Sequence, residues 1–243
     1  MIVGTWLAAV GACDLLRAAR DATSWLRRLC LVVFGCAVLA LAGAALEFTA
    51  SWWWTVGALW SLALVAWVLT SSLALNPTST HHAAWRVAAF VSFGLPLAAL
   101  VVLWSTAPVR PALPTSWQDT VVGQLGLPRT VVFLGALLFE LSTSNLLVRL
   151  LLDATGVSAA HNETDLRGGR LLGPMERVFI LVLAVAGQLT AASVVVAAKG
   201  LLRWPELRSQ SAAGPTSVSE YFLVGSFASW LLGILGWLLT RIS

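Results

Sequence analysis

The sequence predicts a polytopic bundle of transmembrane α-helices, an all-α fold. Of its 243 residues, 58% are hydrophobic and only 11% are charged, and the mean hydropathy of +0.85 lies far from that of soluble domains. The apolar runs are about 20 residues long without period-2 alternation, which matches membrane-spanning helices and not barrel strands. Because hydrocarbon offers no partners to backbone N–H and C=O groups, these runs must form helices that pair the groups internally.

The apolar runs, separated by polar breaks, predict six full-length helices and one short N-terminal helix. The short run has no positively charged start and no small-residue cleavage site, so we interpret it as a span extended by Leu15 and Leu16 and not as a removable signal peptide. In chain order the predicted helices cover residues 1–13, 29–50, 52–75, 86–107, 130–152, 177–199 and 218–240.

These helices fall into a front part and a back part. Residues 1–110 hold the first four apolar runs and are rich in tryptophan, with three consecutive indoles at 52–54, a composition typical of membrane boundaries. Residues 111–129 contain proline and glycine and predict an extracytoplasmic loop. Residues 130–243 form a C-terminal region of three helices.

The 15 Lys and Arg residues predict an orientation. They flank the apolar runs singly or in pairs and form no basic stripe, which argues against a nucleic-acid partner. By the positive-inside rule, the richer set of segments faces the cytoplasm, so we expect a multi-pass protein of the plasma membrane with a cytoplasmic C-terminus. Lys199, Arg203 and Arg208 are the exception, because they fall on the predicted outer side. The richer set comprises segments 14–28, 76–86, 149–177 and the C-terminal end; the poorer set comprises 47–52, 107–129 and 199–217.

Neither a metal site nor a cofactor is predicted. Cys13, Cys30 and Cys36 form no CxxC pair, and His81 and His82 are adjacent residues whose side chains point in different directions in most backbones. The phosphate-binding GxxxxGK motif and the HExxH and GxSxG motifs of hydrolases are all missing from the sequence. Whether the chain is an enzyme therefore stays open.

A carboxylate lies almost at the centre of the predicted helix 130–152. An acidic or basic residue at that depth costs roughly 2.5–3.5 kcal/mol on insertion scales, so Glu140 must be neutral, paired or in contact with water. Behind it, Asn145, Arg149 and Asp153 recur at four-residue intervals and share one helix face, where Arg149 and Asp153 are expected to pair.

The last two predicted helices also have polar centres, at Gln188 and Ser229. Gly225, Ser229 and Gly233 form a series of small residues that favours close helix packing, as do Gly187 and Ala191 in the preceding helix. We therefore expect the three C-terminal helices to join their polar side chains at one depth. The predicted intramembrane polar cluster comprises Glu140, Asn145, Gln188 and Ser229.

Charged residues also gather at the ends of these helices. The connection DLRGGRLLGPMER places three arginines near a helix start, where they either anchor the helix at the cytoplasmic face or hold an anionic headgroup or phosphate. The motifs AAKGLLRWPEL and SEYFLVGS predict a second charged group at the opposite face. The predicted helix-end charged clusters comprise Arg149, Asp153, Arg167, Arg170, Glu176, Arg177, Lys199, Arg203, Glu206, Glu220 and Tyr221.

Four ordered motifs, GGRLLGPMERVFI, GQ, AAKGLLRWPEL and SEYFLVGSFASW, resemble a family of bacterial, often actinobacterial, multi-pass membrane proteins classed as a domain of unknown function. The resemblance covers about residues 145–243. It implies a membrane fold in a bacterial inner membrane and no reaction, because the family has no assigned activity. The signature positions that the resemblance implies are Gly173, Glu176, Arg177, Lys199, Arg203, Glu206, Glu220 and Tyr221.

Three functions are compatible with this pattern. The first is a non-enzymatic helical module that binds a membrane lipid, a small apolar molecule, a partner membrane protein or a second copy through the polar cluster. The second is a membrane enzyme acting on a lipid or isoprenoid substrate, with Glu140 as general acid. The third is a proton-coupled transporter. An enzyme should contain an apolar pocket that reaches a titratable residue, whereas a transporter should contain discontinuous helices or a water path.

Overall fold

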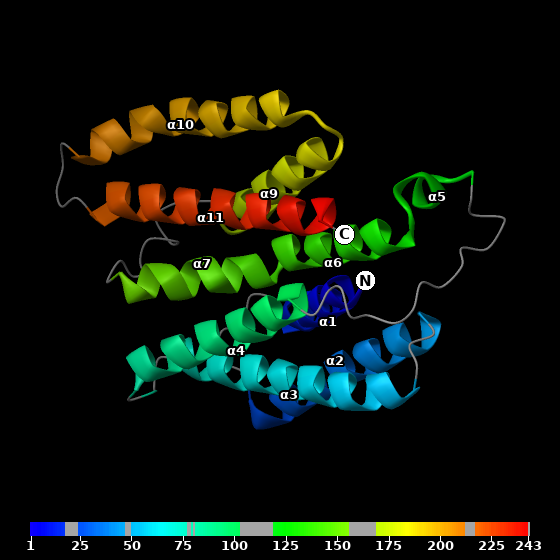
Figure 1. Cartoon of the computed structure of the whole chain (residues 1–243). Helices are drawn as coiled ribbons and strands as arrows, with labels where there is room; N and C mark the ends of the chain where they lie inside the picture. The colour runs from blue at the N-terminus through cyan, green and yellow to red at the C-terminus, as the bar shows by residue number, and fades with distance from the viewer. Residues whose placement is uncertain are drawn as a thin grey trace.

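The computed structural model describes residues 1–17, 24–46, 50–76, 79, 81–102, 119–155, 169–211 and 217–242. In these residues the regular structure is entirely helical, which confirms the predicted all-α class. The longer helices run roughly side by side along one direction (Figure 1). In chain order they are α1 (Ile2–Arg17), α2 (Trp25–Ala45), α3 (Ala50–Ala74), α4 (His82–Val102), α5 (Val121–Leu125), α6 (Leu127–Leu141), α7 (Thr143–Ala154), α9 (Gly169–Val185), α10 (Leu189–Ser211) and α11 (Ser217–Arg241).

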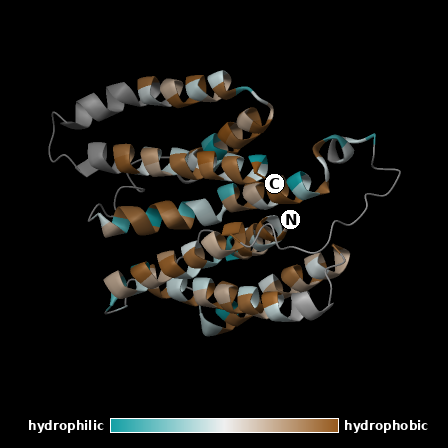
Figure 2. Cartoon of the chain, viewed as in Figure 1, coloured by the Kyte–Doolittle hydropathy of each residue, from teal (hydrophilic) through white to brown (hydrophobic). Residues whose placement is uncertain are grey.

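Several of these helices are suited to crossing a membrane. Helices α2 and α4, most of α3 and most of α11 are long and apolar enough to span, and α6 with α7 makes a fifth span if the bent pair is taken as one. Apolar residues run along the length of α2, α3 and α4 (Figure 2). Large aliphatic side chains on these helices are exposed, as expected where lipid is the solvent; examples are Leu41, Leu59, Leu62, Val87 and Leu95. The fold is that of a membrane protein with several spans, although six full-length helices are not confirmed.

The predicted helix 130–152 is broken at Ser142. Helix α6 ends at Leu141, α7 begins at Thr143, and the two are bent by 46°. The Ser142 amide donates to the Phe139 carbonyl, and its hydroxyl lies 2.6 Å from the Gly11 carbonyl oxygen on α1 and 2.8 Å from that of Leu138. A hydroxyl that bonds backbone carbonyls in this way competes with regular helical pairing. The run of serine and threonine residues therefore interrupts the helix and does not only add polar groups to it.

The predicted helix 177–199 does not exist as one helix. Helix α9 ends at Val185, and the Gly187 and Gln188 amides bond the Ala184 and Leu183 carbonyls at 3.1 and 2.7 Å. This is a Schellman motif, and Gly187 has the positive φ of 77° that the motif requires and that glycine adopts without strain. The chain turns sharply there, and α10 returns along the bundle (Figure 1). The prediction was wrong because Gly187 acts as a helix terminator and not as a packing residue.

The turn at Gly187 reverses α11 relative to its predicted direction. In Figure 1 both termini lie at the end of the bundle where α6 begins. Arg129 near the start of α6 and Arg241 at the end of α11 line the same pocket. The predicted alternation of spans had placed these two residues on opposite membrane faces, so that alternation does not hold.

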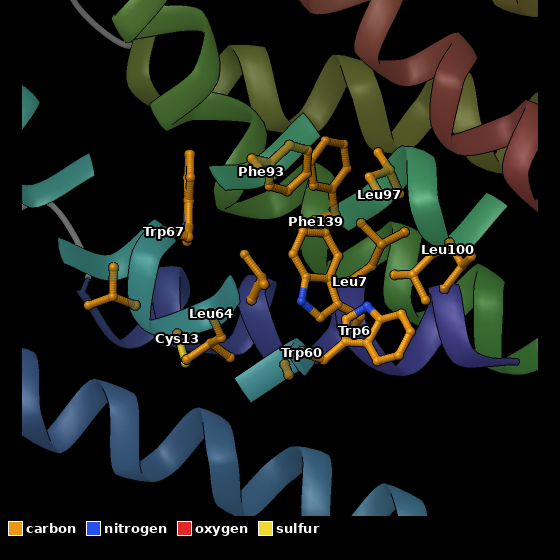
Figure 3. Packing of buried hydrophobic residues seen from close by; sticks show 14 of the residues in the cluster. Trp6, Leu7, Cys13, Trp60, Leu64, Trp67, Phe93, Leu97, Leu100 and Phe139 are labelled. Carbon is orange, nitrogen blue, oxygen red and sulfur yellow. The ribbon is translucent and has the colours of Figure 1, made fainter. Parts of the chain in front are cut away.

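The short N-terminal helix α1 lies at the centre of the packing. It crosses α6 so closely that a Cβ on Gly135 would lie 2.1 Å from the Gly4 carbonyl oxygen, and one on Gly11 would lie 2.7 Å from the Leu138 carbonyl carbon. Around α1, ring centroids 5.2–5.5 Å apart link Trp6 and Trp67 to Phe93, and Phe93 to Phe139 (Figure 3). Because the rings come from α1, α3, α4 and α6, α1 joins the front and back parts of the chain.

Candidate functional site

The predicted intramembrane carboxylate is paired. Glu140, in the last turn of α6, lies with its Oε2 3.2 Å from Nε of Arg177 on α9. The Glu140 side chain is 0% exposed and that of Arg177 is 2% exposed. The Ser144 hydroxyl on α7 donates to Glu140 Oε2 at 2.8 Å. A carboxylate inside the membrane must be neutral, paired or in contact with water. Glu140 is paired, with Arg177.

Arg177 joins four helices. Its Nε and one terminal nitrogen donate to the Glu140 carbonyl oxygen at 3.2 and 3.1 Å. The other terminal nitrogen donates to the Ser229 hydroxyl on α11 at 2.8 Å, while the terminal nitrogen that bonds Glu140 also donates to the Asn145 amide oxygen on α7. The planar guanidinium presents five donors in a fixed geometry, which suits one residue to several acceptors on different helices.

The structure brings together three of the four residues of the predicted polar cluster. Glu140, Asn145 and Ser229 all contact Arg177, which the sequence analysis had assigned to a helix end. Helix α9 begins at Gly169, about two turns before the predicted start, so Arg177 lies in its middle. Gln188 is not part of the cluster, because it lies exposed in the turn between α9 and α10.

The small residues of α11 face α7 and α9, and the closest approach is at Gly236, outside the predicted series. A Cβ on Gly225 would meet Leu152 of α7 at 3.6 Å, and one on Gly233 would meet Ile180 of α9 at 3.4 Å. Gly236 approaches the ion pair itself, because its Cβ would lie 2.9 Å from Glu140 Oε1. This oxygen is buried and has no hydrogen-bond partner among the described residues. Glycine therefore lets α11 pass directly against the carboxylate.

A second buried polar group lies on the other side of the break at Ser142. Asp14 of α1 accepts hydrogen bonds from Trp67 Nε1 at 2.9 Å and from the Thr143 hydroxyl at 2.7 Å. Arg17, one turn further, donates to the Ser71 hydroxyl at 3.0 Å. This group was not predicted, because the first apolar run of the sequence ends at residue 13 and both charges fall in the segment 14–28 after it.

The remaining predicted site residues have separate positions. Glu176 is buried within α9 and not at its start. Arg149 and Asp153 both lie on α7, where the Asp153 carbonyl accepts a 2.8 Å bond from Arg86 of α4. Within the described part of the chain, no three metal-ligating side chains gather. Arg167 lies outside the described residues, as do the side chains of Arg170, Lys199, Arg203, Glu206, Glu220 and Tyr221.

An open pocket of about 420 Å³ lies at the end of the bundle where α6 begins and α11 ends. Two arginines lie at this pocket, and the Arg241 guanidinium carbon is 5.5 Å from the centroid of the Trp237 ring, a cation–π contact. In the sequence both arginines indicate only the orientation of the helices that they flank. The lining residues are Leu125, Arg129, Phe133, Ala184, Val185, Gly187, Leu189, Trp237, Thr240 and Arg241.

By its fold the chain belongs to the class of helical membrane proteins with several spans, here with a buried ion pair and a pocket at one end. No family model, curated protein or solved structure matches it at a significant level. The family resemblance therefore stays a prediction.

Proposed function

We propose that this protein is a non-enzymatic membrane module whose buried charges hold the helices together and whose end pocket binds a lipid or another small apolar molecule. The pocket is the observation that supports binding, because it is open, mostly apolar and provided with a few polar groups. The proposed ligand site is thus the end pocket and not the polar cluster, which the sequence had predicted to bind the ligand.

The polar cluster supports a structural role. Arg177 uses its donors on acceptors from α6, α7 and α11, and the only acceptor without a partner in this described cluster is Glu140 Oε1. Glu140 does not line the pocket. A general acid must reach its substrate, so this arrangement favours a binding module over an enzyme that uses Glu140.

Proton-coupled transport is the second candidate, and the break between α6 and α7 is the observation that favours it. Many secondary transporters place substrate and coupling-ion sites at interrupted helices near the middle of the membrane, and carboxylates within membrane spans form proton relays. Here Glu140 and Asp14 flank Ser142 and contact residues of α7. The two functions differ in what Glu140 must do, because a transporter needs the ion pair to open during each cycle, whereas a binding module needs it to stay closed.

We further propose an orientation in which the pocket end faces outward from the cytoplasm. Among the Lys and Arg residues of the described helices, only Arg129 and Arg241 lie at that end, and the turn at Gly187 is what brings Arg241 there. Apart from the buried Arg177, the other Lys and Arg residues of these helices lie in the helix halves nearer the opposite end. Lys199, Arg203 and Arg208 were exceptions to the orientation predicted from the sequence, but here they lie on the cytoplasmic side with most of the other basic residues. Both termini would then lie on the outer, non-cytoplasmic side of a bacterial plasma membrane.

Reporter fusions test this orientation. Alkaline phosphatase fused after Ile242 should be active, because the enzyme folds only outside the cytoplasm, and green fluorescent protein fused there should stay dark. A fusion within the connection 212–216 should give the reverse pattern. Fluorescence at the C-terminus with active phosphatase at 212–216 would contradict the proposal and restore the cytoplasmic C-terminus.

Filling the pocket tests the proposed function. In nanodiscs containing a phosphatidylcholine with a diazirine on one acyl chain, illumination should label pocket residues such as Phe133, identified by peptide mass spectrometry. Leu189→Trp adds bulk at a half-exposed position on the rim and should reduce this labelling severalfold. Leu201→Trp is the matched control, because Leu201 lies on the same helix, is 76% exposed and does not line the pocket. Equal labelling in both variants would contradict binding in the pocket.

A further inference from the structure

We infer that the pocket is a binding site for one anionic phospholipid, with Arg129 and Arg241 holding the phosphate and the apolar lining holding the start of an acyl chain. This inference rests on the proposed function and adds the chemical class of the ligand.

The two arginines supply positive charge that the described residues do not neutralise. Arg129 lies in the first turn of α6 and Arg241 in the last turn of α11, so two separate helices bring their side chains to one pocket. Both are exposed, and neither has a hydrogen-bonding or acidic partner among the described residues. Guanidinium groups bind phosphate oxygens by paired, charge-assisted hydrogen bonds. A bound anion would therefore neutralise the positive charge of this pocket.

Trp237 holds one of these cations at the pocket. Its ring lies under the Arg241 guanidinium, at 5.5 Å from the guanidinium carbon to the ring centroid, and both residues line the cavity. A tryptophan with a cation at its ring is also the composition found where membrane and water meet. The headgroup of a lipid in the adjacent leaflet lies at this depth.

The rest of the lining is apolar and matches a hydrocarbon chain. Phe133, Val185 and Leu189 come from α6, α9 and α10 and surround the space beside the two arginines. A soluble phosphate would make no use of these side chains, whereas a phospholipid uses both the charges and the apolar wall. Because the pocket is open, the rest of the lipid can remain in the bilayer.

The distribution of charge in the chain strengthens the inference. In the proposed orientation the described helices carry two basic residues at the outer end, Arg129 and Arg241, and both converge on one pocket. Orientation signals do not need such convergence, because the positive-inside rule depends on the count of charges near helix ends and not on where their side chains point. Binding of a negatively charged ligand would explain why Arg129 and Arg241 meet at one pocket.

The test compares two photoactivatable lipids in the full-length protein. Diazirine-labelled phosphatidylglycerol and diazirine-labelled phosphatidylcholine are each added as tracers to phosphatidylcholine nanodiscs, and the yield on pocket peptides is measured. We expect the phosphatidylglycerol yield to exceed that of phosphatidylcholine. Arg129→Gln and Arg241→Gln should each lower it about fivefold, the effect of removing one basic residue near an anionic headgroup. Both should lower the phosphatidylcholine yield less, because the choline cation already offsets the charge of that phosphate. Arg129→Lys should retain most of the preference.

The controls separate this inference from the proposed function. Arg28→Gln makes the same change of charge at the opposite end of the bundle and should leave the pocket yield unaltered. Raising the salt concentration should lower the phosphatidylglycerol preference in the unaltered protein, which tests charge without any substitution. Equal yields for the two lipids, unaffected by salt and by both substitutions, would overturn the anionic specificity and leave a lipid pocket in place. No pocket labelling with either lipid would overturn both proposals.

Discussion

Replacing Arg177 with methionine should lower the free energy of unfolding by about 3–5 kcal/mol, the cost of removing one partner from a buried ion pair. The substitution leaves the Glu140 carboxylate without a cation at a fully buried position and also removes the bonds to Asn145 and Ser229. The measurement is reversible unfolding in mixed micelles titrated with sodium dodecyl sulfate and followed by circular dichroism. The bundle should unfold at a clearly lower denaturant fraction.

A double-mutant cycle identifies the ion pair as the cause. Glu140→Gln keeps an acceptor for Arg177 and should cost less than Arg177→Met, while the pair Glu140→Gln with Arg177→Met removes the isolated carboxylate and should recover part of the loss. Additive effects of the two substitutions would show that the two charges do not stabilise each other. Such a result would also weaken the structural role given to the cluster and favour transport.

Replacing Gly135 with alanine should destabilise the protein by about 3 kcal/mol or more, at the upper end of the cost of overpacking a core. The added Cβ would lie 2.1 Å from the Gly4 carbonyl oxygen, and backbone atoms cannot rotate away as a flexible side chain does. Helices α1 and α6 must therefore separate, and the Ser142 hydroxyl loses its bond to Gly11. The same titration measures the effect, and a cysteine pair across α1 and α6 reports the separation directly.

Gly94→Ala is the matched control for this prediction. Gly94 also lies inside a helix, α4, but its added Cβ would meet no atom within 4 Å. The intrinsic preference of helices for alanine over glycine, about 1 kcal/mol, is the same at both positions, so Gly94→Ala should be neutral or slightly stabilising. If the two variants behaved alike, the close crossing of α1 and α6 would be contradicted.

The polar cluster was only partly predictable from the sequence. Glu140 and Ser229 stand out because a polar residue within an apolar run must find a partner in hydrocarbon. Arg177 did not stand out, because Pro174 and Glu176 resemble a helix start and place the arginine at the membrane surface. The structure continues α9 back to Gly169 and so carries Arg177 into the bundle. Gln188 was misplaced by the opposite error, since its depth was inferred from a helix that ends before it.

The sequence by itself determined that this chain is an all-helical membrane protein with several spans, because composition and run length depend only on the solvent that each segment requires. It also required Glu140 to be neutral, paired or in contact with water. The tertiary structure decided which partner, where the helices break and on which end the C-terminus lies. Those features depend on contacts between distant segments, such as Ser142 with Gly11 and Arg177 with Ser229, and on the positive φ at Gly187. Hydropathy averages over a window of residues, so it contains no information about either.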